Sequence, residues 1–302
     1  MAEPLRVGIV GCAEGTHGKV WAELLAGPGG ERFGMRPVRV WDADPRAAAD
    51  LAGRIGAVAV LEPAAVGKGV DGVLVTELFP DRYLELARPF LVAGQRVFLN
   101  RPFAGSMADA REIVRLAGQH GARLYSASAL FHTAAGRAAR EQLGALGPIS
   151  LFTVTGPTNH LVFYLPHAIA ALVSVLGGGV EMVQAVRLER DRAQPHLAAG
   201  PVVIYAEYGP QAAAGPARGT IQMVGPGVDW YGFRLQLFGA KAEAEPVRFE
   251  VSYDLLLETM AEFFRTGTEP IPPALILEMT GIYYAALASA AQRGKPMRLA
   301  QL

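Results

Sequence analysis

Residues 5–18 read Leu-Arg-Val-Gly-Ile-Val-Gly-Cys-Ala-Glu-Gly-Thr-His-Gly, and this stretch decides the fold class. The apolar run Leu5 to Val10 is typical of a buried parallel strand. Gly11 would form the tight turn after it, Ala13 would allow close approach of a ligand to the backbone, and Gly18 would let the next helix pack on the strand. The stretch predicts a dinucleotide turn with a phosphate at the helix start. Its spacing departs from G-x-G-x-x-G, so an ordinary turn is the alternative.

The second chemical signal is Asp42, which follows the predicted strand Val38 to Trp41. A carboxylate at this place can accept the ribose hydroxyls of NAD and would repel the 2′-phosphate of NADP. Alternatively, Asp42 caps a helix together with Asp44, and Arg46 binds a 2′-phosphate. The sequence therefore favours NAD and keeps NADP as the alternative. The expected cofactor-binding set is Gly11, Ala13, His17, Gly18, Asp42, Thr76, Glu77, Asn100 and Arg101.

Strand and helix patterns alternate through residues 1–127, which predicts an α/β Rossmann domain with a doubly wound parallel sheet. The expected strands are Leu5–Val10, Val38–Trp41, Val58–Leu61, Gly72–Thr76, Arg96–Leu99 and Ala122–Ala127. The expected helices are Lys19–Ala26, Pro45–Ile55, Asp81–Ala93 and Met107–His120.

Residues 128–302 follow a different pattern, in which polar and apolar positions alternate along several strands. This pattern predicts a second, α+β domain with an open, mostly antiparallel sheet. The expected strands are Ile149–Thr155, Val180–Arg190, Val202–Tyr208, Thr220–Val224 and Phe233–Phe238, and the expected helices are Thr133–Leu143, Pro166–Leu176, Tyr253–Thr266 and Ala274–Gln292.

Composition narrows the possible partners. The 302 residues exceed the usual size of a single core, which fits two domains. Lys plus Arg and Asp plus Glu number 28 each, so the net charge of zero argues against nucleic acid or an anionic membrane as the main partner. The single cysteine, Cys12, forms no disulfide framework, so we expect a cytoplasmic protein. The six histidines are scattered, which predicts no metal site.

A third signal is Asn100-Arg101-Pro102, which follows the buried strand Arg96–Leu99. An X-Pro turn here places a cation at the end of a strand. An arginine cannot give up its proton near neutral pH, so Arg101 can orient and polarise an oxygen but cannot shuttle a proton. Alternatively, Arg101 is a structural cation that holds the loop.

With these motifs, the chain resembles the Gfo/Idh/MocA family of glucose–fructose oxidoreductase and inositol dehydrogenase. The similar segments are residues 71–76, 93–103, 107–121, 167–177 and 285–296. The resemblance implies NAD(P)-dependent transfer of hydride to or from a sugar, a cyclitol or a related hydroxy or carbonyl compound. It also implies a substrate cleft between the two domains and a homodimer or homotetramer.

The chain departs from the family at its chemical positions. Arg101 replaces a lysine that binds the substrate hydroxyl, Phe163 replaces an aspartate, and Leu130 or Phe131 replaces an arginine. His167 is retained.

His167 would lie in the first turn of its helix, where the helix dipole favours the neutral ring of a general base. Its alternative role is that of a helix-end histidine satisfied by the backbone.

The expected catalytic set is His167, Arg101 and Tyr164, and the expected substrate contacts are Asn159 and His160, although such polar residues also cap loops. Two functions follow: an oxidoreductase with a degenerate catalytic set, or a non-catalytic nucleotide- or sugar-binding protein of the same fold.

Overall fold

The computed structural model describes residues 3–158, 160–187, 201–225 and 232–302. Contacts divide the chain into two compact units. The first consists of residues 1–127 with Leu256–Ile276, and the second of residues 128–255 with Leu277–Leu302. The division predicted from the sequence placed residues 256–276 in the second domain, whereas their contacts group them with the first.

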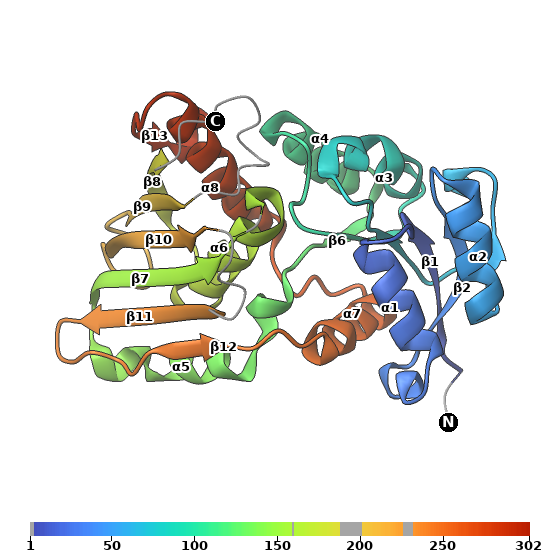
Figure 1. The fold of residues 1–302 in the computed structure, drawn as a ribbon, viewed down its shortest axis with the longest axis horizontal. Coiled ribbons are helices and arrows are strands. Elements are labelled where there is room, and N and C mark those ends of the chain that lie inside the picture. The colour runs from blue at the N-terminus through green and yellow to red at the C-terminus, as the bar shows by residue number, and fades with distance from the viewer. Residues whose placement is uncertain (1–2, 159, 188–200, 226–231) are drawn as a thin grey trace. The chain divides into compact units, whose positions relative to one another are not determined.

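The first unit contains a six-stranded parallel sheet in the order β3-β2-β1-β4-β5-β6, as predicted for a Rossmann domain (Figure 1). Its strands are β1 (Leu5–Val10), β2 (Met35–Trp41), β3 (Val58–Ala59), β4 (Gly72–Val75), β5 (Arg96–Leu99) and β6 (Arg123–Tyr125). Its helices are α1 (His17–Ala26), α2 (Pro45–Ile55), α3 (Tyr83–Val92) and α4 (Met107–His120). The central strands are buried on both faces, since every residue of β4 is buried.

Helix α7 (Asp254–Thr266) supplies most of the late segment that joins the first unit. The ring of Phe264 lies over Gly72, where an added Cβ would come within 2.1 Å of the ring. Arg96 donates a hydrogen bond to the carbonyl of Phe264 at 2.5 Å, and Leu124 N–H donates to the Glu269 carboxylate at 2.9 Å. These contacts attach the segment to β4, β5 and β6.

The second unit contains a seven-stranded sheet in the order β12-β11-β7-β10-β9-β8-β13 (Figure 1). Only the β10–β7 pair is parallel among the described strand pairs, so the sheet is mostly antiparallel, as predicted. Its strands are β7 (Ile149–Pro157), β8 (Val180–Arg187), β9 (Val202–Tyr208), β10 (Arg218–Val224), β11 (Phe233–Gly239), β12 (Val247–Phe249) and β13 (Met297–Arg298). Residues 188–190, the end of the predicted strand Val180–Arg190, lie outside the described residues.

Three helices belong mainly to this unit: α5 (Ala134–Leu146), α6 (Leu161–Leu176) and α8 (Pro273–Ala291). Burial alternates along β9, where Ile204 and Ala206 are buried and Val203 is exposed. The alternation shows that one face of the sheet is covered and the other is not.

Helix α6 begins five residues before the start predicted at Pro166. The prediction treated the proline as the first helical residue, but Pro166 lies inside the helix. An interior proline removes one backbone hydrogen bond. The buried residues Leu161, Val162 and Leu165 stabilise the extra turn, because they add apolar contact to the core.

Helix α8 is long and apolar enough, by length and composition, to cross a bilayer. This test is also passed by core helices, and 44% of its most apolar window is buried within the protein. Its Glu278 accepts hydrogen bonds from the N–H groups of Gly179 and Val180 at 2.6 and 2.9 Å. These features fit a core helix of the second unit.

Candidate functional site

The turn after β1 has the geometry that its glycines predict. Gly11 adopts a φ of +88°, and a Cβ there would lie 2.4 Å from the backbone nitrogen of Glu77. A Cβ on Gly18 would lie 2.1 Å from the carbonyl oxygen of Gly11 and 2.3 Å from Thr76 Oγ1. Neither position can hold a side chain without moving backbone. The glycines therefore let α1 start directly against the ends of β1 and β4.

Hydrogen bonds join the ends of four neighbouring strands at this edge of the sheet. Gly11 N–H donates to the carbonyl of Trp41, Thr76 N–H to that of Val10, and Asn100 N–H to that of Val75, at 2.7 to 2.9 Å. The Thr76 hydroxyl is buried and donates to the Gly11 carbonyl at 2.7 Å. In an open α/β sheet, ligands bind at this carboxyl edge.

Asp42 anchors the turn from the end of β2. Its Oδ2 atom accepts the N–H groups of Cys12 and Ala13 at 2.6 and 2.7 Å, and its Oδ1 accepts the N–H of Asp44 at 2.9 Å. The residue is 8% exposed. Asp44, not Asp42, caps α2, because it accepts the N–H of Arg46 at 2.9 Å. Asp42 thus fixes the backbone between Gly11 and α1.

Cys12 lies in the same turn and carries an unreactive thiol. Burial, together with the negative charge of Asp42, raises the pKa of this thiol to about 12. The thiol is therefore protonated at neutral pH. A thiolate is the nucleophilic form of cysteine, so Cys12 is a packing residue.

His17, the first residue of α1, contacts both polar residues that follow β5. Its Nδ1 lies 2.9 Å from Asn100 Nδ2, and its Nε2 lies 3.3 Å from Arg101 Nη2. Its ring also stacks on Trp21, with centroids 4.9 Å apart. The peptide bond between Arg101 and Pro102 is cis. The structure therefore joins three of the predicted cofactor-binding residues in one cluster: His17, Asn100 and Arg101.

The His17 ring is neutral at physiological pH. Burial, together with the positive charge of Arg101, lowers its pKa to about 3, although a hydrogen bond with Asn100 opposes the shift. A protonated ring has no acceptor nitrogen, whereas Arg101 can only donate. A neutral His17 ring with its lone pair on Nε2 can therefore accept a hydrogen bond from the guanidinium.

Glu77 and Tyr83 complete the polar surroundings of this edge. Burial raises the pKa of the Glu77 carboxyl, Arg82 opposes the rise, and Asp42 adds to it. The Tyr83 hydroxyl is buried and donates to the carbonyl of Glu77 at 2.8 Å. Burial also raises the pKa of this phenol, while Arg101 and a hydrogen bond with Asn100 oppose the rise. The sequence analysis missed Tyr83, which reads as an ordinary apolar helix position.

The turn fits a dinucleotide on its own geometry. Gly15 has a φ of +81° and nothing within 4 Å of the position of a Cβ, so the loop before α1 has open space beside it. Thr16 caps α1 by accepting the N–H of Lys19 at 3.2 Å. A helix N-terminus next to such a loop attracts a phosphate through its dipole and its N–H groups. Ala13 stands on the half-buried part of the turn, where its small side chain leaves the backbone accessible.

In the second unit, His167 bonds to a residue that the sequence analysis did not select. The Oγ atom of Ser128 lies 2.5 Å from His167 Nδ1. The ring also packs near Phe233, with centroids 5.6 Å apart. His167 is the seventh residue of α6, which begins at Leu161, so it does not lie in the first turn as predicted. The helix dipole acts mainly on the first turn, so that argument for a neutral ring does not hold.

The other predicted residues of this unit lie at or before the start of α6. His160 is the exposed residue before the helix, and its ring meets that of Phe163 at 5.8 Å. Tyr164 is half-buried. Their spacing of three and four residues places His160, Phe163, Tyr164 and His167 along one side of the helix. Asn159 lies outside the described residues.

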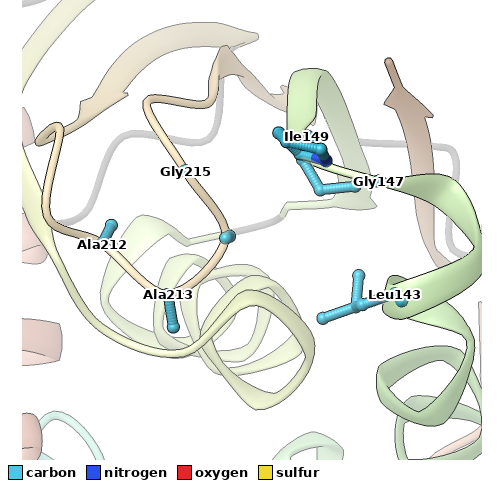
Figure 2. Close-up of a pocket in the computed structure, with 9 residues that line it drawn as sticks. Leu143, Gly147, Ile149, Ala212, Ala213 and Gly215 are labelled. Carbon is cyan, nitrogen blue, oxygen red and sulfur yellow. The ribbon is translucent and has the colours of Figure 1, made fainter. Parts of the chain in front are cut away.

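A cavity of about 350 Å³ lies in the second unit between the end of α5 and the loop at residues 212–215 (Figure 2). Glycine, alanine, proline, leucine and isoleucine form its lining, and Figure 2 shows Leu143, Ile149 and Ala213 among them. These side chains carry no acid, base or nucleophile. The cavity is therefore not a candidate for the chemistry.

A metal centre finds no support in the part of the chain that the structure describes. No group of three or more His, Cys, Asp or Glu side chains there could hold a metal ion.

Comparison with protein families identifies the first unit. Residues 5–128 match the model GFO_IDH_MocA, described as an oxidoreductase family with an NAD-binding Rossmann fold. This match places residues 5–128 in the Gfo/Idh/MocA family of oxidoreductases. NAD is the cofactor that the family description assigns to this domain. No curated protein matches the sequence.

Solved structures extend the similarity over the whole chain. A probable dehydrogenase from Thermotoga maritima has a TM-score of 0.79 and 17% identity, covering 98% of this chain and 99% of the other. Apo scyllo-inositol dehydrogenase from Lactobacillus casei has a TM-score of 0.79 and 14% identity, covering 99% and 100%. An oxidoreductase from Agrobacterium radiobacter, in complex with NAD+, L-tartaric acid and magnesium, has a TM-score of 0.76 and 16% identity, covering all of both chains. These similarities show the fold.

Proposed function

We propose that the protein transfers hydride between NAD(H) and a small polyhydroxy compound such as a sugar or cyclitol. The observation that carries the proposal is the cluster of His17, Asn100 and Arg101 beside the glycine turn. It places a fixed cation at the carboxyl edge of a Rossmann sheet. NAD(H), when bound, supplies or accepts the hydride. The inositol dehydrogenase and the tartrate complex among the similar structures support a polyhydroxy substrate.

In this proposal Arg101 orients and polarises the substrate oxygen. Its charge does not depend on pH, so it acts by electrostatics and hydrogen bonding rather than by proton transfer. His17, at the start of α1, contacts the guanidinium, and Asn100 contacts the other ring nitrogen of His17. His167 is the proposed proton donor or acceptor, because imidazole changes charge near neutral pH. Tyr164, on the same helix side, is a second proposed substrate contact.

We propose NAD(H) as the preferred cofactor over NADP(H). Asp42 stands at the end of β2 with its carboxylate held by three backbone N–H groups. An ionised carboxylate at this place repels a 2′-phosphate. Arg46 is exposed in the first turn of α2, and its positive charge would favour NADP(H) by attracting the 2′-phosphate.

We also propose that copies of the chain associate through the uncovered face of the second sheet. Leu151, Val186 and Val203 are 46%, 50% and 37% exposed, although they lie within strands β7, β8 and β9. Apolar side chains on an uncovered sheet face gain from burial against a partner. Light scattering should show a dimer or tetramer.

The alternative is a binding protein of the same fold without catalysis. Phe163 stands where the family resemblance expects an aspartate, and Arg101 stands where it expects a lysine. Both changes remove a proton-transfer group. The alternative predicts cofactor binding without turnover.

A turnover assay with a panel of sugars, cyclitols and hydroxy acids tests the proposal. The absorbance of the reduced nicotinamide reports hydride transfer in either direction. We expect His167→Ala to lower kcat by about 100-fold or more, the usual contribution of a general acid or base. His120→Ala, on the first unit's α4, is the matched control and should leave kcat unchanged. Cofactor binding without turnover on any substrate would favour the binding protein.

A further inference from the structure

We propose that binding of NAD(H) exchanges one anion for another at Lys19: the Glu14 carboxylate, which pairs with Lys19 in the free protein, gives way to the pyrophosphate of the cofactor. Lys19 is then a binding residue for the cofactor, and Glu14 is a residue that weakens cofactor binding. The inference rests on the proposed cofactor site at the Gly11–Gly18 turn, and it depends neither on the identity of the substrate nor on turnover.

The side chain of Lys19 runs back from α1 toward the glycine turn. Lys19 is the third residue of α1, and its N–H donates to Oγ1 of the capping residue Thr16 at 3.2 Å. Its ammonium group donates a hydrogen bond to the carboxylate of Glu14, which lies five residues earlier and within the turn. The positive charge therefore lies beside the loop whose helix start attracts a phosphate.

The Glu14 carboxylate is bound in the way that a separate anion would be. It accepts hydrogen bonds from the Lys19 ammonium and from the backbone N–H of Gly15. The bond with Lys19 and its charge hold the pKa of the Glu14 carboxyl below its ordinary value, and the charge of Arg54 adds to the effect. A lysine ammonium and the N–H groups of a glycine loop are also donors that bind phosphate in proteins. The carboxylate therefore uses donors that suit a phosphate oxygen.

The two side chains of the pair differ in exposure, which decides the one that moves. The Glu14 side chain is 88% exposed, so its carboxylate can turn into water without losing packing. The Lys19 side chain is 21% exposed, so most of its methylene stem is packed against the protein. Gly15 has nothing within 4 Å of the position of a Cβ, which leaves space for the incoming anion. Glu14 therefore leaves the pair, and Lys19 stays in place.

Electrostatics favours the exchange but makes Glu14 oppose binding. The pyrophosphate has two negative charges, and a hydrogen bond from an ammonium to a phosphate is charge-assisted at both ends. A Glu14 carboxylate that remained on Lys19 would face the phosphates with like charge. Movement of Glu14 into water relieves this repulsion, but it breaks the ion pair. The affinity of the turn for NAD(H) is therefore lower with Glu14 than it would be with a neutral residue at this position.

Calorimetric titration of the full chain with NADH tests the exchange in four forms: the wild type, Glu14→Gln, Lys19→Met and the double variant. Glu14→Gln should lower the Kd about threefold or more, because no ion pair then has to break. In the Glu14→Gln background, Lys19→Met should raise the Kd about tenfold, because it removes a charge-assisted bond to phosphate. In the wild-type background, Lys19→Met should raise the Kd only about threefold, because it also removes the ion pair that opposes binding.

The matched control is Glu262→Gln, which removes the same charge from another exposed ion pair of the first unit. Glu262 pairs with Arg265 on α7, and the two side chains are 60% and 55% exposed. Helix α7 contacts Gly72 and Arg96, the first residues of β4 and β5, so it lies at the edge of the sheet opposite the glycine turn. Glu262→Gln should leave the Kd of NADH within about twofold of the wild-type value. Tighter binding equal to that of Glu14→Gln would show a general effect of charge and would overturn the proposal.

The unequal effect of Lys19→Met in the two backgrounds is the decisive result. An ion pair that stayed intact in the complex would give the same factor in both, and that result would overturn the proposal. Binding by Glu14→Gln that is no tighter than by the wild type would also overturn it. No heat from any of the four forms would refute the cofactor site together with the exchange. Failure to turn over any substrate would refute the proposed hydride transfer and leave these four Kd values unaffected.

Discussion

Replacing Asp42 by alanine should release the turn between Gly11 and α1 and weaken the binding of both NAD(H) and NADP(H), that of NADP(H) less because the 2′-phosphate is no longer repelled. The wild-type carboxylate accepts the N–H groups of Cys12, Ala13 and Asp44. A carboxylate whose only task was to contact a ribose would not need these bonds. Its loss would change cofactor preference and leave the protein stable.

The magnitude follows from the two turn bonds. Leaving a buried N–H group without an acceptor costs about 1 to 3 kcal/mol. Cys12 is buried and Ala13 is half-buried, so Asp42→Ala should lower the free energy of unfolding by about 3 kcal/mol. If the turn opens locally instead, the same free energy raises the Kd for NAD(H) by about 100-fold. Asp42→Asn should cost less, because its amide oxygen can still accept both turn N–H groups.

Urea denaturation and calorimetric titration with both cofactors measure these effects. Asp44→Ala is the control, since it removes only the cap bond to Arg46 and should cost about 1 kcal/mol. The reasoning is refuted if Asp42→Ala has wild-type stability and binds NADPH more tightly. That result would assign Asp42 to the ribose alone.

Further predictions concern the turn, the cation, the sheet face and pH. Gly18→Ala should lower the free energy of unfolding, measured by urea denaturation, by about 3 kcal/mol, because its Cβ would lie 2.1 Å from the Gly11 carbonyl oxygen. Gly53→Ala in α2 is the control and should not lower it, because nothing lies within 4 Å of the added Cβ. Arg101→Lys should change kcat and leave the Kd of NADH within about threefold of the wild-type value. A larger change in this Kd would show that the guanidinium binds the cofactor. Leu151→Glu should shift light scattering toward the monomer. Acidification from pH 6.5 toward 3 should lower the free energy of unfolding, because His17 takes up a proton in this range only in the unfolded chain. His17→Gln should make the free energy of unfolding depend less on pH in this range.

Local signals in the sequence predicted much of the first unit. Helices α2 and α4 have the predicted bounds, because Asp44 and Ser106 cap their starts and Gly56 and Gly121 end them with positive φ. Strand β1 also has the predicted bounds. The functions of Gly11 and Gly18 followed from their spacing, since the close approaches involve neighbouring backbone.

Contacts between distant segments could not be predicted in this way. The predicted start of α6 was wrong. Pro166 is a strong local signal for a helix start, whereas the packing of Leu161 and Leu165 depends on the whole core. The return of residues 256–276 to the first unit depends on Phe264 meeting Gly72, which no local pattern reports. Ser128 was missed for the same reason: a serine before a short helix reads as a cap, and only the fold brings it to His167.

The most direct test is calorimetric titration of the full chain and of Ala13→Trp with NADH. The account predicts binding to one site per chain in the wild type. It predicts no binding in Ala13→Trp, with an unchanged melting temperature, because the indole would cover the backbone that faces the pyrophosphate. Equal binding by both proteins, or no heat from the wild type at millimolar NADH, would contradict a dinucleotide site at the Gly11–Gly18 turn.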